Sequence, residues 1–322
     1  YLIRDYVRQL EQLELEQDGK LLQPRRLGPS SWQVDLDPSG GALLIRYRVM
    51  AADLSVRTCH MDQDHAFLAL AAVVMELEGE RWSPHRLHCR LPEGWQVFVP
   101  LPPAAEPAQG WLASDLDQLL DSPLEAGPHA THAFAVGGVQ HRWVCWAGVN
   151  GADGWLLERY PSLLSDVQRV CEACCRLLGQ DRPAADHYLF VLHLLDEGYG
   201  GLEHDNASVL VYGRRDFTKP NGYRRFLQLV AHEYLHQWNV RRLRPQELAP
   251  IDYHRPAVVP TLWFAEGVTS YFDQFLPFVA GLCSEEDLIE DLGEELSRYL
   301  LATGRRVQNL RLSSCLLYTS PS

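Results

Sequence analysis

Long apolar runs are scarce in this sequence. The longest uninterrupted one, residues 66–75, has about ten residues, whereas a helix that spans a bilayer needs roughly twenty. Internal repeats and low-complexity segments are also lacking, which argues against a solenoid or a disordered chain. With 46% apolar and 22% charged residues, the composition is that of an ordinary globular protein. We therefore predict no transmembrane segment.

Basic residues are also in short supply. The chain has 29 Lys and Arg against 42 Asp and Glu, which gives a formal net charge of −13. A phosphate backbone needs a basic surface to bind. The sequence therefore argues against a nucleic-acid partner and leaves the oligomeric state open.

Cysteines lack the dense, regular spacing of a secreted disulfide scaffold. The eight that are present lie scattered along the chain, so we interpret them as reduced thiols and expect a cytoplasmic location. The sequence opens at Tyr1, without an initiator Met. We expect the natural N-terminus to lie upstream, which leaves a signal peptide open.

The length and the changes in periodicity predict two domains and an α+β fold. Residues 1–153 carry short alternating runs, such as 42–49, 95–99, 132–136 and 141–147, and are expected to form a β-rich domain. Residues 154–312 are expected to be mixed α/β. Here a helical repeat covers 163–178, two strands at 188–195 and 208–212 flank a Gly-rich turn, and helices follow residue 223. Residues 313–322 resemble translated adapter sequence and are expected to be a non-native tail.

The string Ala231-His-Glu-Tyr-Leu-His236 carries the chemistry. On a helix, residues four apart share a face, so His232 and His236 can bind one zinc ion while Glu233 lies beside the attacking water as general base. Given the content of His and Glu, this pattern arises by chance in about 3% of such chains. The alternative of two unrelated histidines on a helix is therefore disfavoured.

A zinc peptidase needs a third protein ligand and one open position. The candidate is Glu266, thirty residues after His236 in an apolar stretch that predicts a helix from about residue 260. Burying a carboxylate without a partner is costly. Glu266 could instead form a salt bridge with Arg241 or Arg242, but the HExxH motif upstream favours a metal ion as its partner.

Three segments together resemble the glycyl aminopeptidase family of zinc metallopeptidases, the M61 family. They are residues 232–245 (HEYLHQWNVRRLRP), 263–271 (WFAEGVTSY) and 200–204 (GGLEH), and the start, YLIRDY, is similar to part of the family's N-terminal domain. The resemblance implies a thermolysin-like (gluzincin) catalytic domain behind a β-rich domain. It also implies a C-terminal PDZ domain and an oxyanion-stabilising tyrosine, both of which are expected beyond the end of this sequence.

The resemblance further implies an aminopeptidase that prefers N-terminal Gly or Ala. Glu203 is similar to the glutamate with which related enzymes hold the substrate's α-ammonium, and such a carboxylate near the zinc selects removal of one residue. We expect Glu203 on a strand edge or turn that faces the zinc. The backbone of Gly200 and Gly201 is expected to contact an extended peptide. His204 either contacts the substrate or closes the turn. The alternatives are a zinc endopeptidase or a noncatalytic peptide-binding remnant.

Two further features have structural interpretations. The CxxC at Cys171 to Cys174 lies in a helical apolar stripe, which predicts core packing rather than a metal site. The basic run 241–244 is expected to brace the region after the zinc helix.

Overall fold

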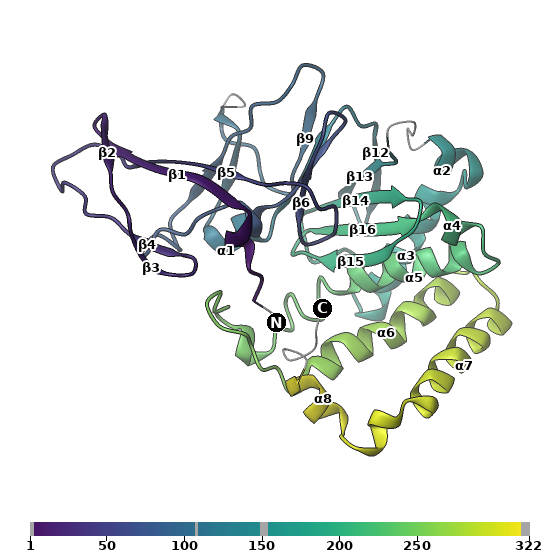
Figure 1. The fold of residues 1–322 in the computed structure, drawn as a ribbon. Coiled ribbons are helices and arrows are strands. Elements are labelled where there is room, and N and C mark those ends of the chain that lie inside the picture. Colours follow the sequence, from purple (N-terminus) through teal and green to yellow (C-terminus); the bar gives the residue numbers. More distant parts are fainter. Residues whose placement is uncertain (1–2, 107–108, 149–153, 317–322) are drawn as a thin grey trace.

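In the computed structural model, which describes residues 3–106, 109–148 and 154–316, the chain has a β-rich half and a helix-rich half (Figure 1). The N-terminal part forms small antiparallel sheets. One has the order β2-β1-β5, one pairs β3 with β4, one pairs β10 with β8, and a four-stranded one has the order β6-β7-β11-β9. The α+β fold class predicted from the sequence is confirmed.

The elements of this half are short. Their bounds are β1 Leu10–Gln17, β2 Lys20–Leu22, β3 Arg25–Gly28, β4 Ser31–Gln33, β5 Leu44–Val49, β6 Cys59–Met61, β7 Ala66–Ala69, β8 His85–Leu87, β9 Gln96–Phe98, β10 Trp111–Ala113, α1 Leu116–Leu120 and β11 Pro123–Gly127.

A five-stranded sheet, ordered β12-β13-β14-β16-β15, forms the centre of the molecule. The bounds are β12 Thr131–Val136, β13 Val139–Trp146, β14 His187–Leu195, β15 Tyr199–Glu203 and β16 Ala207–Gly213. β13, β14 and β16 run parallel, and β15 lies antiparallel at one edge. The run predicted at 188–195 is apolar except for His193, because β14 is covered on both faces.

Helices cover one face of this sheet, and strands of the N-terminal half cover the other. Trp143, Phe190 and Leu210 pack towards the helices, whereas Val191 and Val209 pack against Phe67 and its neighbours. The helices are α2 Gly154–Arg159, α3 Leu163–Leu177, α4 Arg214–Phe217, α5 Gly222–Leu235, α6 Leu262–Val279, α7 Glu285–Leu301 and α8 Leu310–Leu316. Cys171 and Cys174 of α3 are fully buried in this core, so the prediction of core packing is confirmed.

The central sheet crosses the domain boundary that the sequence predicts between residues 153 and 154. β12 and β13 precede that boundary, yet β13 pairs with β14 along its length. Residues 149–153 lie outside the described part of the chain. The division at 153–154 therefore stays a prediction, while the sheet that supports the candidate site begins at Thr131.

The expected non-native tail is only partly described. Residues 313–316 belong to α8, where the hydroxyl of Ser314 accepts a hydrogen bond of 3.0 Å from the backbone N–H of Trp263 in α6. Residues 317–322 lie outside the described residues. No helix in the described ranges is long and apolar enough to cross a membrane.

Candidate metallopeptidase site

The helix α5 brings the two histidines of the HExxH motif together. His232 lies in its last turn and His236 caps its C-terminus, so the four-residue spacing places both rings on one face. Their ring centroids are 4.7 Å apart. The helix is anchored from behind by Phe226, Val230 and Tyr234, which are fully buried in the core.

Glu266 reaches this pair from α6, which packs against α5. Its Oε2 lies 3.6 Å from Nε2 of His232 and 3.6 Å from Nε2 of His236. The three ligand atoms all lie within 4.8 Å of one another. The structure therefore assembles the three residues that the sequence proposes as metal ligands.

The alternative partners of Glu266 are engaged elsewhere. Arg241 donates a hydrogen bond of 2.7 Å to Asp205 and forms an ion pair of 2.8 Å with Asp121. Arg242 donates to the backbone carbonyl of Gln237 at 2.7 Å. The basic run thus braces the loop after α5, as the sequence predicts.

Two further groups fix which nitrogen each imidazole presents. Nδ1 of His232 is 2.7 Å from Oδ2 of Asp273, and Nδ1 of His236 is 2.7 Å from the backbone oxygen of Asn239. With Nδ1 bonded in this way, Nε2 is the free ligand atom, which is the usual arrangement around a metal. Sequence reasoning missed Asp273. Its position seven residues after Glu266, two turns along the same helix face, is a signal that could have revealed it.

The donor set fits zinc. Ligands bound to zinc at about 2.0–2.2 Å in a tetrahedral arrangement lie roughly 3.4 Å apart, close to the two measured separations of 3.6 Å. Burial alone would lower the pKa of His232, but Asp273 and Glu266 raise it to about 10. Burial opposes ionisation of Glu266, yet both histidines hold its pKa well below the ordinary value. Such a cluster of opposed charges is typical of a functional site.

Glu233 is buried beside the three ligands. Its exposed fraction is 5%, and burial raises its pKa to about 8, with a further contribution from Glu203. A divalent cation at the neighbouring ligands would lower that pKa again. A carboxylate whose ionisation is opposed in this way is suited to accept and donate a proton.

The edge strand β15 lies on the other side of Glu233. The sequence predicts a Gly-rich turn between the two strands, with Glu203 on a strand edge or turn. The structure has the edge strand, because Tyr199–Glu203 pairs with β16 over five residues. A Cβ on Gly201 would lie 2.0 Å from Oε1 of Glu233, whereas a Cβ on Gly200 would meet nothing within 4 Å. Only glycine at residue 201 allows the strand to approach the carboxylate so closely.

Glu203, at the end of β15, joins the site, whereas His204 turns away to another partner. Glu203, Glu233 and His236 offer ligand atoms within 4.8 Å of one another. The ring of His204 is buried, and its Nδ1 lies 3.3 Å from Oδ1 of Asp121. Of the two interpretations of His204, this contact favours closing the end of the strand.

A cavity of about 350 Å³ opens beside these residues. Tyr199, Gly201, His232, Glu233 and Asp273 line one part of it, and further residues of α5, α6 and α7, several of them charged, line the rest. The size suits a few residues of a peptide.

Family models and a solved structure are similar to this chain. A model described as the Peptidase M61 N-terminal domain matches residues 1–128, and one described as M61 glycyl aminopeptidase matches residues 225–321. A crystal structure of an aminopeptidase N family protein from Idiomarina loihiensis is 30% identical with a TM-score of 0.90, and the match covers 99% of this chain and 55% of that one. The chain therefore spans little more than half the length of that relative.

A more distant structure shares the fold alone. A mutant M1 zinc metallopeptidase from Deinococcus radiodurans is 13% identical with a TM-score of 0.50, and the match covers 94% of this chain and 68% of that one. A search of curated proteins found no match.

Proposed function

Because the chain belongs to the M61 peptidase family, we propose that it is a zinc-dependent aminopeptidase, which removes the first residue from peptides with a free N-terminus. The observation that carries the proposal is the convergence of His232, His236 and Glu266 from two helices, with Glu233 and Glu203 at the same point. Three ligands and one open position are what a catalytic zinc site requires.

His232, His236 and Glu266 would hold the zinc ion. When bound, zinc supplies Lewis acidity that activates water and polarises the scissile carbonyl. Asp273 and the carbonyl of Asn239 keep both imidazoles in the tautomer that presents Nε2. Glu266 adds a negative charge to the ligand set.

Glu233 would move the proton. A carboxylate Oε of Glu233 accepts a proton from the attacking water and delivers it to the nitrogen of the leaving amine. Its burial favours the protonated form, and the nearby cationic groups favour the ionised form. Burial has the larger effect and raises the pKa to about 8, and a group whose pKa lies near the working pH serves both as base and as acid.

Glu203 would select the aminopeptidase reaction over an endopeptidase one. A carboxylate close to Glu233 and His236 pairs with an α-ammonium located one residue from the scissile bond. The backbone of the edge strand β15, including Gly200 and Gly201, would pair with the extended substrate. The preference for N-terminal Gly or Ala is an expectation from the family resemblance alone.

The experiment compares a Gly-initiated peptide with its N-acetylated counterpart. Acetylation removes the charge that Glu203 would bind, and a hydrogen bond to a charged group contributes about 1.5–3 kcal/mol, so kcat/KM should fall about 10- to 150-fold or more. In a Glu203→Gln variant the two peptides should differ much less.

Equal cleavage of both peptides by the wild-type protein would identify an endopeptidase. Zinc binding without cleavage of either peptide would instead support a noncatalytic peptide-binding protein.

A further inference from the structure

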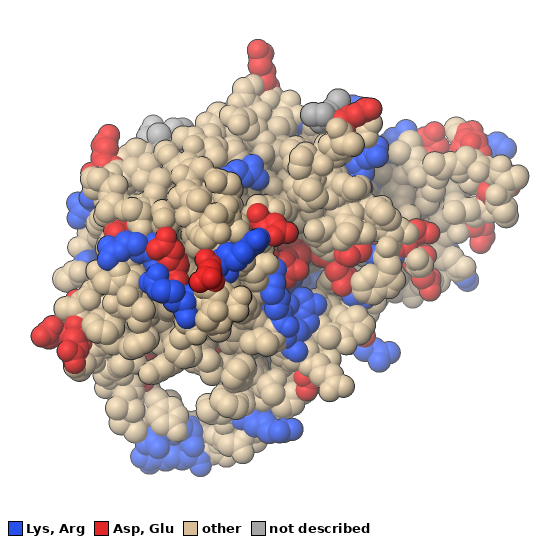
Figure 2. Space-filling model, turned by 180° about the vertical axis from the view of Figure 1, so that it is seen from behind, with Lys and Arg blue, Asp and Glu red and all other residues tan. Residues whose placement is uncertain are grey.

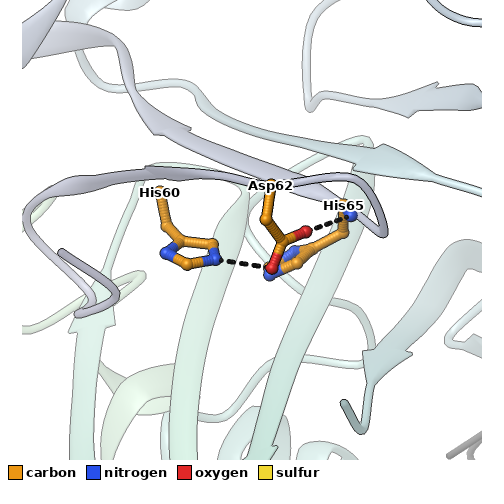
Figure 3. Close-up of side chains that lie close together, drawn as sticks. All are labelled: His60, Asp62 and His65. Carbon is orange, nitrogen blue, oxygen red and sulfur yellow. Dashed lines mark hydrogen bonds and ion pairs between the residues drawn. The ribbon is translucent and has the colours of Figure 1, made fainter. Parts of the chain in front are cut away.

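A second group of metal-ligand side chains lies in the N-terminal half, on the hairpin formed by β6 and β7. His60 is in β6, and Asp62 and His65 are in the turn that follows (Figure 3). None of these residues belongs to the site on α5 and α6. The ligand atoms of the three side chains lie within 4.8 Å of one another.

The carboxylate of Asp62 is held in place by the turn itself. Its Oδ1 accepts hydrogen bonds from the backbone N–H groups of Asp64 at 2.8 Å and His65 at 3.0 Å. Its Oδ2 lies 3.0 Å from Nε2 of His60. The oxygen is thereby positioned between the two imidazoles, as Figure 3 shows.

Glu125 fixes the tautomer of His65. Nδ1 of His65 is 3.0 Å from Oε1 of Glu125, and both side chains are fully buried. The same carboxylate lies 2.7 Å from Nε2 of His129 and 2.9 Å from Nε2 of His193, so three imidazole nitrogens face its two oxygens. A carboxylate anion accepts and does not donate, so Nδ1 of His65 carries the proton and Nε2 carries the lone pair.

Nε2 of His65 has no hydrogen-bond partner among the described residues, although it is buried. Leaving such an atom without a partner costs about 1–3 kcal/mol. Trp146 stacks on the ring with centroids 3.9 Å apart, which prevents the ring from turning to find another partner. A carboxylate that orients a histidine whose other nitrogen is free is the arrangement found around bound metals.

We propose that His60, Asp62 and His65 bind a first-row divalent transition-metal ion, with zinc as the probe, at a second site separate from the catalytic one. Two imidazoles and one carboxylate suit such ions better than Ca²⁺ or Mg²⁺, which prefer oxygen ligands. The side chains of His60 and Asp62 are 22% and 36% exposed, so the ion enters from solvent and water completes its coordination.

The bound ion would connect the hairpin to the central sheet. Glu125 bonds His65 and also lies 2.9 Å from Nε2 of His193 in β14. An ion on His65 would therefore be linked through Glu125 to the strand at the centre of the molecule. Its role would be to stabilise the contact between the two halves.

A competing location is the group of His65, Glu125 and His129. There the two histidines lie at hydrogen-bond distances of 3.0 and 2.7 Å from Glu125. These bonds satisfy the buried carboxylate without an ion, so this location leaves the free Nε2 of His65 unexplained.

The test is the zinc stoichiometry of the purified protein at nanomolar buffered free zinc. The wild type should bind two ions per chain. A His60→Ala/Asp62→Asn variant should bind one ion. Loss of an outer-shell partner lowers metal affinity about 10- to 100-fold, and loss of two direct ligands should lower the affinity of the second site by more than that. Asn keeps the Oδ1 that holds the turn. A His232→Ala/His236→Ala variant should also bind one ion.

Matched controls keep the result specific. Asp64→Asn removes a charge from the same turn and His88→Ala removes an exposed histidine from the same half, and both should retain two ions. The single His60→Ala variant should reproduce the loss if the double variant folds poorly. The proposal is overturned if the His232→Ala/His236→Ala variant binds no zinc, whereas a single wild-type ion that this variant keeps would overturn only the proposed catalytic site. It is also overturned if the double variant still binds two, which would place the ion at Glu125 or elsewhere.

Discussion

At the scale of single residues, Glu233 carries the proton transfer in the proposed reaction. The Glu233→Gln change keeps the size of the side chain and removes its basicity. We expect kcat to fall by about 100- to 10,000-fold, with zinc content unchanged, since Glu233 is not one of the proposed ligands. Zinc content and turnover should be measured on the same preparation. Loss of zinc would make Glu233 a ligand and contradict the assignment.

Gly201 and Gly200 offer a test within one strand. Gly201→Ala adds a methyl group that would lie only 2.0 Å from Oε1 of Glu233. The carboxylate must move, and a displacement of about 1 Å in a catalytic group can cost about 100-fold in rate. Gly200→Ala meets no atom within 4 Å, so it leaves Glu233 in place and should lower turnover far less than Gly201→Ala. Similar rates for the two variants would show that the close approach of β15 is unimportant.

The sequence predicts the central residues of the site and misses those that orient them. The HExxH spacing determines a helix face, so His232, Glu233 and His236 could be found without a structure. Glu266 required the family's chemistry as well. Asp273 was missed because an acid on an apolar helix has no distinctive motif, and its partner is forty-one residues away in sequence.

At the scale of elements, the packing of α6 on α5 sets the strength of metal binding. Asp273 in α6 accepts from Nδ1 of His232. Asp273→Ala should weaken zinc binding about 10- to 100-fold, as loss of such partners does elsewhere, and Asp273→Asn should weaken it less because the amide oxygen still accepts. Competition with a zinc-sensitive dye measures the change.

The exposed Asp252 provides the control. Asp252→Asn should bind zinc as the wild type does. If the Asp273→Ala variant also bound zinc as tightly as the wild type, Glu266 would be the only residue of α6 that contributes to zinc binding.

Helices were easier to predict than the edge strand. The repeat at 163–178 became α3, Leu163–Leu177, because a wide apolar stripe must face a core. The sequence left Glu203 on either a strand edge or a turn, because two adjacent glycines are typical of turns. Here the pairing with β16 and the space required by Glu233 outweigh that local preference.

At the scale of the whole molecule, an ion-pair network joins the two halves beside the site. Arg241, on the loop after α5, pairs with Asp121 at the end of α1 and with Asp205 after β15. Burial would raise the pKa of Asp121, but Arg241 and His204 hold it below the ordinary value. Removing one partner of a buried pair typically costs 3–5 kcal/mol, so Arg241→Ala should lower the free energy of unfolding by about 3 kcal/mol.

Urea unfolding measures this effect. Arg255→Ala removes an arginine whose side chain is 84% exposed, and it should leave stability unchanged, since exposed ion pairs contribute little. Equal stabilities of the Arg241 and Arg255 variants would show that the network does not hold the halves together.

The charged side chains of the two signs are mixed on the surface. On the face shown in Figure 2, basic side chains are interspersed with acidic ones rather than gathered into one patch. Near the lower edge, where Figure 1 places α6 to α8, the molecule has an opening. Large apolar side chains of these helices, including Ile289, Leu301 and Leu312, are 47–81% exposed. The sequence could not predict the shared central sheet, because β13 and β14 pair residues that lie 47 positions apart in the sequence.

A crystal structure of the zinc-loaded protein with glycine hydroxamate tests the central claim most directly, because it locates the metal and the substrate's amine together. Hydroxamates chelate zinc while leaving the amine free. We predict zinc bound by His232, His236 and Glu266 at about 2.0–2.2 Å, with the ligand's α-ammonium within about 3 Å of a Glu203 carboxylate oxygen. Zinc bound without Glu266, or an ammonium directed away from Glu203, would contradict the account.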